Sequence, residues 1–335
     1  MKILLIDADS TIPNLALMKL STYHKSLGDT VGLLRLEMPY YPNRHKKEHD
    51  IDTSVYERTY CSVIFTGNVT HIHGKNIIFG GTGTYDTTTC LPEEIEGLQP
   101  DYTLYPENNM SYGFISRGCI RKCSFCFVPK KEGSIRQVNT IAHIAQHKKT
   151  VFMDNNFLAL PNHIELLQEL VDKKIRCTFN QGLDLRLVTP ENSALLHKLR
   201  YMGEYIFAFD NKAYLPIIEE KLPLISWRKH WQIKMYVYVH PDMPLEDTLF
   251  RVQWLKDHQI LPYIMRDISC WADERHHFYV DLASWCNQVQ FFKKKTFEEF
   301  LIKRYPKNKT RVCTSLEYYN SPTVKTPYTP YTPKK

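Results

Sequence analysis

The sequence predicts an α/β protein with an open parallel sheet at its N-terminus, followed by a partial barrel of six βα units. Short apolar runs that end at polar residues recur along the chain, and helical patterns lie between them. These runs are nearly continuous, which is typical of strands buried on both faces of a sheet. With 335 residues, of which 43% are hydrophobic and 24% charged, the chain is long enough for two globular domains.

The first domain is expected to span residues 1–100. A helix should open at Pro13-Asn14 and end near Gly28, since leucines recur there at helical spacing. A connector at 91–110, rich in proline, glutamate and asparagine, marks the domain boundary. The expected strands are 2–7, 30–35, 61–66 and 76–79.

The second domain is expected to span residues 106–290. Asn162 with Glu165 resembles a capping box, Thr189-Pro190 is a typical helix start, and leucines from Leu245 onward mark another helix. Polar residues gather at the carboxyl ends of the strands, where βα barrels carry their chemistry. The expected strands are 112–116, 150–154, 176–180, 205–210, 233–239 and 261–266.

The last segment, 291–335, is a basic extension with a low-complexity tail. From Asn308 onward the apolar periodicity is lost, so the tail is expected to be disordered or extended. It contains the repeat Thr326-Pro327-Tyr328 and Thr329-Pro330-Tyr331. Lysines and arginines from Lys293 to Arg311 form either a solvated surface or an anion-binding face.

The overall composition favours a cytoplasmic protein. The start of the chain is not a signal peptide, because its apolar run is short and meets Asp7 and Asp9. No apolar run is long enough for a membrane span, so no membrane partner is expected. Six of the nine cysteines are scattered singly, which does not suggest a disulfide framework. The net charge of +7 permits a nucleic-acid partner without requiring one.

The remaining three cysteines, Cys119, Cys123 and Cys126, form a C-x3-C-x2-C motif in a basic loop after an expected strand. Thiolates select iron–sulfur clusters, zinc or copper. Three ligands leave one iron of a four-iron cluster open for a small molecule. Zinc is the main alternative, but no second cysteine pair supplies a fourth ligand, and His143 and His147 lie some way downstream. Buried structural cysteines are a further alternative.

The loop at 117–133 resembles the cluster loop of the radical S-adenosylmethionine (SAM) superfamily. Phe125 stands just before the third cysteine, where this family commonly has an aromatic residue. The resemblance implies a 4Fe-4S cluster on Cys119, Cys123 and Cys126. It also implies SAM on the open iron, reductive cleavage of SAM to a 5′-deoxyadenosyl radical, and a flavodoxin- or ferredoxin-type reductant protein.

The resemblance also suggests further SAM contacts at the barrel mouth. The family's Gly-Gly-Glu element is absent, and Asp154 with Asn156 stands in its place, unless the latter only forms a turn. Asn180 follows the third strand, and Arg186 could pair with the SAM carboxylate or with a neighbouring acid on the surface. Asp210-Asn211 and Arg266-Asp267 end later strands and are expected to face substrate.

The N-terminal domain resembles the cobalamin-binding domains of this superfamily, in its Rossmann-like sheet and its Gly80-Gly81 pair. The Asp-x-His-x-x-Gly signature is absent, and His71 and His73 lack its spacing, so cobalamin is a cofactor that the resemblance permits.

The reaction remains open between methyl transfer and methylthiolation of RNA. Methylthiolation needs three more cysteines, and this domain holds only Cys61 and Cys90. A non-enzymatic metalloprotein that binds nucleic acid is the alternative from another class. Aromatic residues of the basic run could then stack on bases, namely Phe291, Phe292, Phe297 and Tyr305.

Overall fold

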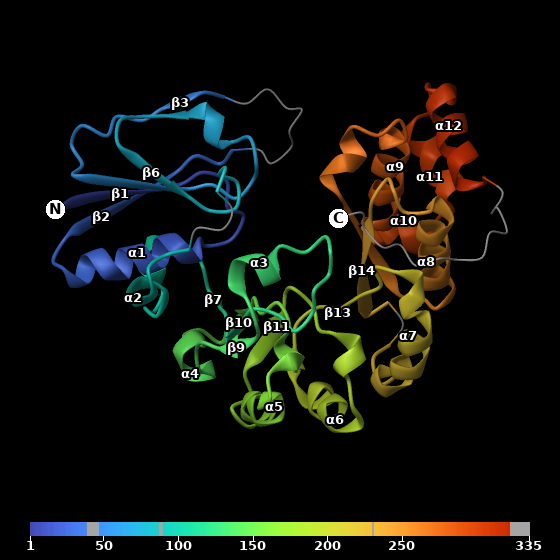
Figure 1. Ribbon diagram of the computed structural model, residues 1–335, viewed down its shortest axis with the longest axis horizontal. Helices are drawn as coiled ribbons and strands as arrows, with labels where there is room; N and C mark the ends of the chain where they lie inside the picture. The colour runs from blue at the N-terminus through green and yellow to red at the C-terminus, as the bar shows by residue number, and fades with distance from the viewer. Residues whose placement is uncertain (39–46, 87–89, 230, 322–335) are drawn as a thin grey trace. The chain divides into compact units, whose positions relative to one another are not determined.

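The structure of the chain is a computed structural model, and it describes residues 1–38, 47–86, 90–229 and 231–321. The chain divides into two compact units, Met1–Asp154 and Asn155–Lys335. Each unit contains parallel strands with helices between them (Figure 1). The predicted α/β class with parallel sheets is therefore confirmed.

The first unit begins with a parallel sheet of four strands in the order β2-β1-β4-β6. The strands are β1 (Lys2–Asp7), β2 (Thr30–Arg35), β4 (Arg58–Ser62) and β6 (Ile77–Gly80). Asn14 caps helix α1 (Leu15–Ser26), because its side chain accepts a hydrogen bond from the backbone N–H of Leu17. Strands β1 and β2 are confirmed as predicted, whereas the third strand ends at Ser62, earlier than expected.

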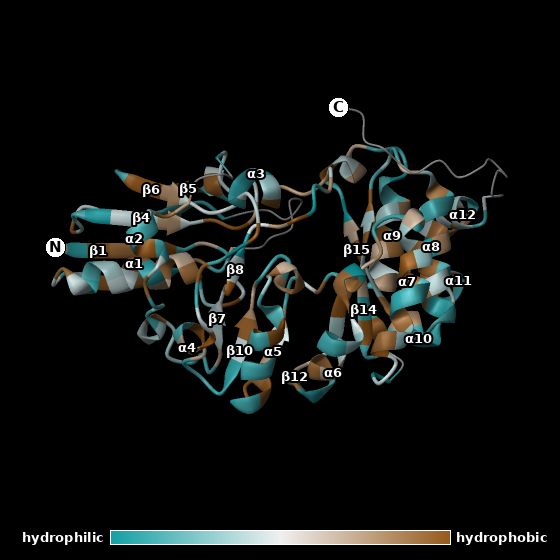
Figure 2. Ribbon diagram, turned by 60° about the horizontal axis from the view of Figure 1, so that its bottom comes forward, coloured by the Kyte–Doolittle hydropathy of each residue, from teal (hydrophilic) through white to brown (hydrophobic). Residues whose placement is uncertain are grey.

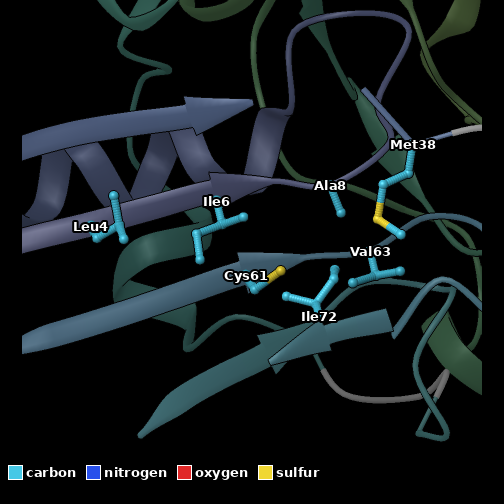
Figure 3. Close-up of a cluster of buried hydrophobic side chains, with 7 residues drawn as sticks. All are labelled: Leu4, Ile6, Ala8, Met38, Cys61, Val63 and Ile72. Atoms are coloured by element: carbon cyan, nitrogen blue, oxygen red, sulfur yellow. The ribbon is translucent and has the colours of Figure 1, made fainter. Parts of the chain in front are cut away.

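Both faces of strand β1 are buried, as its continuous apolar run predicts. Alternate residues of β1 serve opposite sides: Ile3 and Leu5 pack with α1, whereas Leu4 and Ile6 face a second core. Figure 3 shows this second core around Leu4, Ile6, Ala8, Met38, Cys61, Val63 and Ile72. The apolar character of β1 appears as brown ribbon in Figure 2.

The rest of the first unit consists of short elements. Strand β7 (Ser111–Gly113) pairs in parallel with β10 (Lys149–Phe152), and β8 (Ser116–Arg117) pairs antiparallel with β9 (Arg136–Gln137). The predicted strand at 112–116 is thus two short strands with a break between them. The other elements are β3 (His49–Asp50), β5 (Ile72–His73), α2 (Glu93–Glu96), α3 (Val128–Glu132) and α4 (Ile141–Ile144).

The second unit contains two sets of parallel strands. Strand β11 (Arg176–Phe179) pairs with β12 (Arg200–Tyr201), and β13 (Tyr205–Ala208), β14 (Ile233–Val239) and β15 (Leu261–Arg266) form a three-stranded sheet. The helices between them are α5 (His163–Asp172), α6 (Pro190–Lys198), α7 (Leu215–Lys221) and α8 (Leu245–Asp257). Helix α6 starts at the predicted cap, with Thr189 and Asn192 in a reciprocal capping box.

The C-terminal helices pack together instead of trailing from the unit. They are α9 (His276–Cys286), α10 (Val289–Lys294), α11 (Phe297–Arg304) and α12 (Lys309–Tyr319). The expectation that order ends near Asn308 is therefore wrong for α12. Its Arg311 forms a two-point ion pair with the buried Asp281 of α9, and Ser315 donates to the same carboxylate at 2.8 Å. The predicted tail beyond residue 321 lies outside the described residues.

Two sequence expectations about the architecture stay predictions. No closed six-stranded barrel is formed within either unit over the described ranges, so the partial barrel remains unconfirmed. The predicted domain limits (1–100, 106–290 and 291–335) stay predictions, and the two compact units divide between Asp154 and Asn155. No helix in the described part of the chain is long and apolar enough to cross a membrane.

Candidate functional site

The cysteine motif lies in a loop whose two ends are joined by the short β8–β9 pairing. Ser116 pairs with Gln137 and Arg117 with Arg136, so the chain leaves and re-enters this ladder on either side of the cysteines. The loop carries helix α3 on its returning half. A loop closed at its base presents its side chains from a fixed platform, which a multi-ligand site requires.

Gly118, directly before the first cysteine, is required by close backbone packing. Its φ is +80°, and a Cβ atom at this position would lie 2.2 Å from the carbonyl oxygen of Ser134 and 2.6 Å from that of Gly133. No other residue type fits this approach without moving the backbone. The Arg-Gly pair before the motif therefore has a structural reason: it lets the outgoing strand touch the returning one.

Glu132 fixes the start of the loop. Its carboxylate accepts hydrogen bonds from the Arg117 guanidinium and from the backbone N–H of Gly118, both at 2.9 Å. The backbone N–H of Cys119 then donates to the Gly133 carbonyl at 3.2 Å. The sequence interpretation missed Glu132, although a single acid beside Lys130 and Lys131 in a basic loop is a usable signal.

The three thiols are accessible and are not part of a core. Cys119, Cys123 and Cys126 are each partly exposed and form no disulfide. The backbone N–H of Arg121 donates to the Sγ of Cys119 at 3.3 Å, and that of Cys126 donates to the Cys123 carbonyl at 3.0 Å. The buried-cysteine alternative is therefore wrong for this motif.

In the described part of the chain, no three His, Cys, Asp or Glu side chains converge where a single metal ion would be held. His147, one of the histidines considered for zinc, instead lies 3.1 Å from the Ser111 hydroxyl.

The residues around the thiols fit a negatively charged cluster. The loop is basic and supplies an N–H to the Cys119 sulfur, and such amide contacts tune clusters. Three large apolar side chains of the loop stand exposed, namely Ile120 at 47%, Phe125 at 42% and Phe127 at 55%. Apolar side chains beside a cluster limit the access of water. Phe125 thus lies in the loop, as the sequence predicts, while its contact with a cofactor stays a prediction.

Asp154 lies after β10 and anchors the strand that leads into the cysteine loop. Its carboxylate is fully buried and accepts hydrogen bonds from the Ser116 backbone N–H at 2.5 Å and the Ser116 hydroxyl at 2.6 Å. The N–H of Ile115 is a third donor at 3.3 Å. Burial raises the pKa of Asp154 to about 6, and these hydrogen bonds oppose the rise. The carboxylate reaches no surface, and its predicted contact with SAM stays untested.

The other predicted SAM contacts lie in the second unit. Asp184 joins two of them: it lies 3.4 Å from the Asn156 amide, and it accepts two guanidinium hydrogen bonds from Arg186 at 2.6 and 3.1 Å. The local ion pair, which was the alternative for Arg186, is thus present. The Asn180 carbonyl accepts a hydrogen bond from the Tyr236 hydroxyl at 3.1 Å. Binding of SAM by these residues stays a prediction.

A polar cluster that the sequence interpretation only partly found lies at the carboxyl ends of β14 and β15. Asp267 accepts a hydrogen bond from the Tyr238 hydroxyl at 2.7 Å, and the His240 ring lies 3.8 Å away. Asp210 accepts from the Tyr238 backbone N–H at 3.0 Å, and burial raises its pKa to about 6. Tyr238 and His240 lie at the carboxyl end of the apolar strand β14. Their position after an apolar run could have identified them from the sequence as candidate site residues.

The two histidines that were weighed as cobalt ligands in the first unit lie beside one acidic side chain. His71 and His73 both bind the carboxylate of Glu48, at 2.6 and 2.7 Å, and these contacts lower the pKa of Glu48. Cys61 is a core thiol, and burial raises its pKa to about 12 (Figure 3). A buried thiol of this kind is a poor metal ligand, which disfavours a second cluster in this unit.

Two of the aromatic residues considered for base stacking are in the core. Phe292 is 0% and Phe297 1% exposed, and both rings pack against Trp285. Two of the four aromatic rings that the nucleic-acid alternative requires for base stacking are therefore buried and unavailable for it. The Lys303 ammonium lies over the Phe291 ring, at 5.4 Å from its centre.

Comparison with known proteins adds no family to this description. No protein-family model matches the chain, and no curated protein matches it.

Proposed function

We propose that this protein is a radical SAM enzyme that binds a 4Fe-4S cluster through Cys119, Cys123 and Cys126. The observation that carries the proposal is the three accessible thiols in one basic loop, closed at its base by β8–β9. Three ligands leave one iron for SAM. When bound and reduced, the cluster would supply the electron that cleaves SAM to methionine and a 5′-deoxyadenosyl radical.

The chain's own residues would prepare this site in two ways. Glu132 and Gly118 set the direction in which the loop leaves β8, and the buried Asp154 holds the backbone of Ser116 before it. Ile120, Phe125 and Phe127 would limit the access of water and oxygen to the cluster. The electron would come from a flavodoxin- or ferredoxin-type protein of the cytoplasm, to which the basic loop offers a complementary surface for an acidic partner.

The substrate would meet the carboxyl ends of the strands in the second unit. The polar cluster of Tyr238, His240 and Asp267 offers hydrogen-bond donors and acceptors there. Methyl transfer is the reaction type that we favour. The buried Cys61 speaks against the second cluster that methylthiolation needs. Cobalamin binding by the first unit is an extension of the same proposal, and titration with cobalamin would detect it by the visible spectrum.

Anaerobic reconstitution with iron and sulfide tests the proposal. The wild-type protein should turn brown, hold about four irons per chain and release 5′-deoxyadenosine from SAM with dithionite. Substitution of serine for Cys119, Cys123 or Cys126 should remove the iron and the SAM cleavage together. The matched controls are Cys90→Ser and Cys313→Ser, which replace exposed thiols outside the loop. A colourless wild-type protein that holds stoichiometric zinc would refute the proposal.

A further inference from the structure

The helices that follow the last strand carry most of the positive charge of the chain. Segment 293–311 contains eight lysines and arginines and two glutamates, so it holds +6 of the net charge of +7. Helices α10, α11 and α12, on which most of these residues lie, all pack against α9 in the second unit. The rest of the chain is close to neutral, and a local excess of this kind is the electrostatic footprint of a protein that binds a polyanion.

Six of the eight cations are exposed, and none of the six forms an ion pair with the described residues. The ion pair that does form in this segment joins Arg311 to the buried Asp281. The two glutamates, Glu298 and Glu299, lie in the first turn of α11, and Glu299 caps this helix by accepting a hydrogen bond from the Thr296 N–H. The six exposed cations form what we call the basic face: Lys293, Lys294, Lys303, Arg304, Lys307 and Lys309.

Aromatic rings hold cations of the basic face in place. The Lys303 ammonium lies 5.4 Å from the centre of the Phe291 ring, and the ring centres of Phe291 and Phe300 are 5.2 Å apart. The Arg304 guanidinium lies 5.7 Å from the centre of the Phe300 ring. These cation–π contacts restrict the two side chains before an anion arrives, which lowers the entropy that binding would cost.

Two guanidinium groups are also held close together at the end of α11. Arg304 lies 5.5 Å and Arg311 5.0 Å from the centre of the same ring, that of Tyr305. Asp281 accepts hydrogen bonds from Arg311 and from the Tyr305 hydroxyl, so it neutralises Arg311 and leaves the charge of Arg304 uncompensated. A phosphate beside Arg304 would reduce the repulsion between the two cations.

The packing of these helices favours a nucleic acid over a membrane surface. A helix that lies on a membrane buries an apolar face in the lipid. The apolar side of α11 is instead inside the protein, with Phe297, Phe300 and Leu301 at most 2% exposed. Over residues 289–319, all of which the structure describes, Ile302 is the only exposed large apolar side chain. A single strand is flexible enough to follow cations that lie on three helices, whereas a duplex is stiff.

We propose that the basic face binds the phosphate backbone of single-stranded nucleic acid without reading its sequence. The six exposed cations contact phosphates, and the rings of Phe291, Phe300 and Tyr305 position Lys303 and Arg304 for that contact. The inference goes beyond the proposed function, and the binding needs neither a cluster nor SAM.

Binding of a fluorescein-labelled oligothymidylate of about 20 nucleotides to the full-length chain, followed by fluorescence anisotropy, tests the proposal. If the six cations each neutralise one phosphate, the logarithm of the affinity should fall with the logarithm of the salt concentration with a slope of about −4. The affinity should therefore drop roughly 300-fold between about 50 and 200 mM NaCl.

A double variant assigns the binding to the basic face. Lys303→Gln/Arg304→Gln removes two of the cations, so it should weaken binding about 20-fold near 0.1 M salt and make the slope shallower by about 1.4. The matched control Lys198→Gln/Arg200→Gln removes one exposed lysine and one exposed arginine elsewhere in the second unit and should bind like wild type. Thermal unfolding of both double variants shows whether they are folded.

Equal losses of affinity in the two double variants would overturn the proposal, because net charge alone would then account for the binding. A wild-type slope shallower than about −1 would also overturn it, and that measurement depends on no variant. Tighter binding of a duplex with the same number of phosphates would rule out the single strand. Binding to phosphatidylglycerol vesicles with the same loss in Lys303→Gln/Arg304→Gln would assign the basic face to a membrane surface instead.

Discussion

Replacement of Gly118 by alanine tests whether the closed loop prepares the cluster site. The substitution forces a Cβ atom to within 2.2 Å of the Ser134 carbonyl oxygen, whereas contacts under 3.0 Å are essentially never observed. The returning strand must therefore retreat. The hydrogen bond from Cys119 to the Gly133 carbonyl then weakens, a loss of about 1 kcal/mol. The left-handed backbone itself costs roughly 1–2 kcal/mol once a Cβ is present.

Gly28 offers the matched control, because its φ is +81° and a Cβ atom there would meet nothing within 4 Å. Gly28→Ala therefore bears the backbone cost without the steric clash. About 1 kcal/mol of extra cost corresponds to a factor of about five in an equilibrium. We expect the iron content after anaerobic reconstitution to fall about fivefold further in Gly118→Ala than in Gly28→Ala.

Iron and sulfide analysis of the two variants, with thermal unfolding as a check on folding, measures this difference. Both variants should unfold within a few degrees of each other, since both bear the cost of a left-handed backbone with a Cβ atom. Equal iron content in the two variants would refute the reasoning that the packing of Gly118 shapes the site. A larger loss of iron in Gly28→Ala would refute it as well.

Three further predictions concern single side chains. Burial raises the folded-state pKa of Asp154 to about 6, so ionisation of this carboxyl lowers the stability of the folded protein as pH rises from about 4 to 6. Over that interval the unfolding free energy of Asp154→Asn, measured with urea, should rise relative to that of wild type by on the order of 2 kcal/mol. A difference that does not change with pH would contradict this prediction. Asp281→Asn weakens the ion pair with Arg311 and should lower the unfolding free energy by about 3 kcal/mol, because Asp281 is buried. In the same assay the control Asp273→Asn, whose carboxylate is more exposed, should lower it by less than about 1 kcal/mol. Equal effects would show that burial of Asp281 does not strengthen its contribution to stability. Phe125→Ala should change the unfolding free energy by less than about 0.5 kcal/mol, because the ring is exposed. The same substitution should speed the bleaching of a reconstituted cluster in air, since the ring shields the loop. An unchanged bleaching rate would argue against that shielding role.

Local patterns predicted the secondary structure where one residue or one run decided it. The strands Lys2–Asp7, Thr30–Arg35, Ile233–Val239 and Leu261–Arg266 have the bounds expected from their apolar runs. Thr189 caps α6 as predicted because its hydroxyl and the following proline act within one turn. The expected capping box at Asn162 is wrong, since that side chain makes no cap hydrogen bond.

Elements that depend on distant partners could not be predicted in this way. Helix α12 lacks an apolar stripe that a periodicity would reveal, and it is secured by the ion pair between Arg311 and Asp281, thirty residues earlier in the chain. The anchoring role of Asp154 likewise depends on Ser116. Both contacts join residues whose separation along the sequence carries no signal.

The sequence by itself determined the α/β class, most strand positions and the three thiols of the candidate site, because apolar runs and ligand spacing are local properties. Only the tertiary structure decided that Asp154 serves the backbone before the loop, that Arg186 pairs with Asp184, and that Phe292 and Phe297 belong to the core. A polar or aromatic side chain can satisfy its bonding inside the protein or at a ligand. Which of these it does depends on what folding brings within about 3 Å of it, and that distance is not written in the sequence.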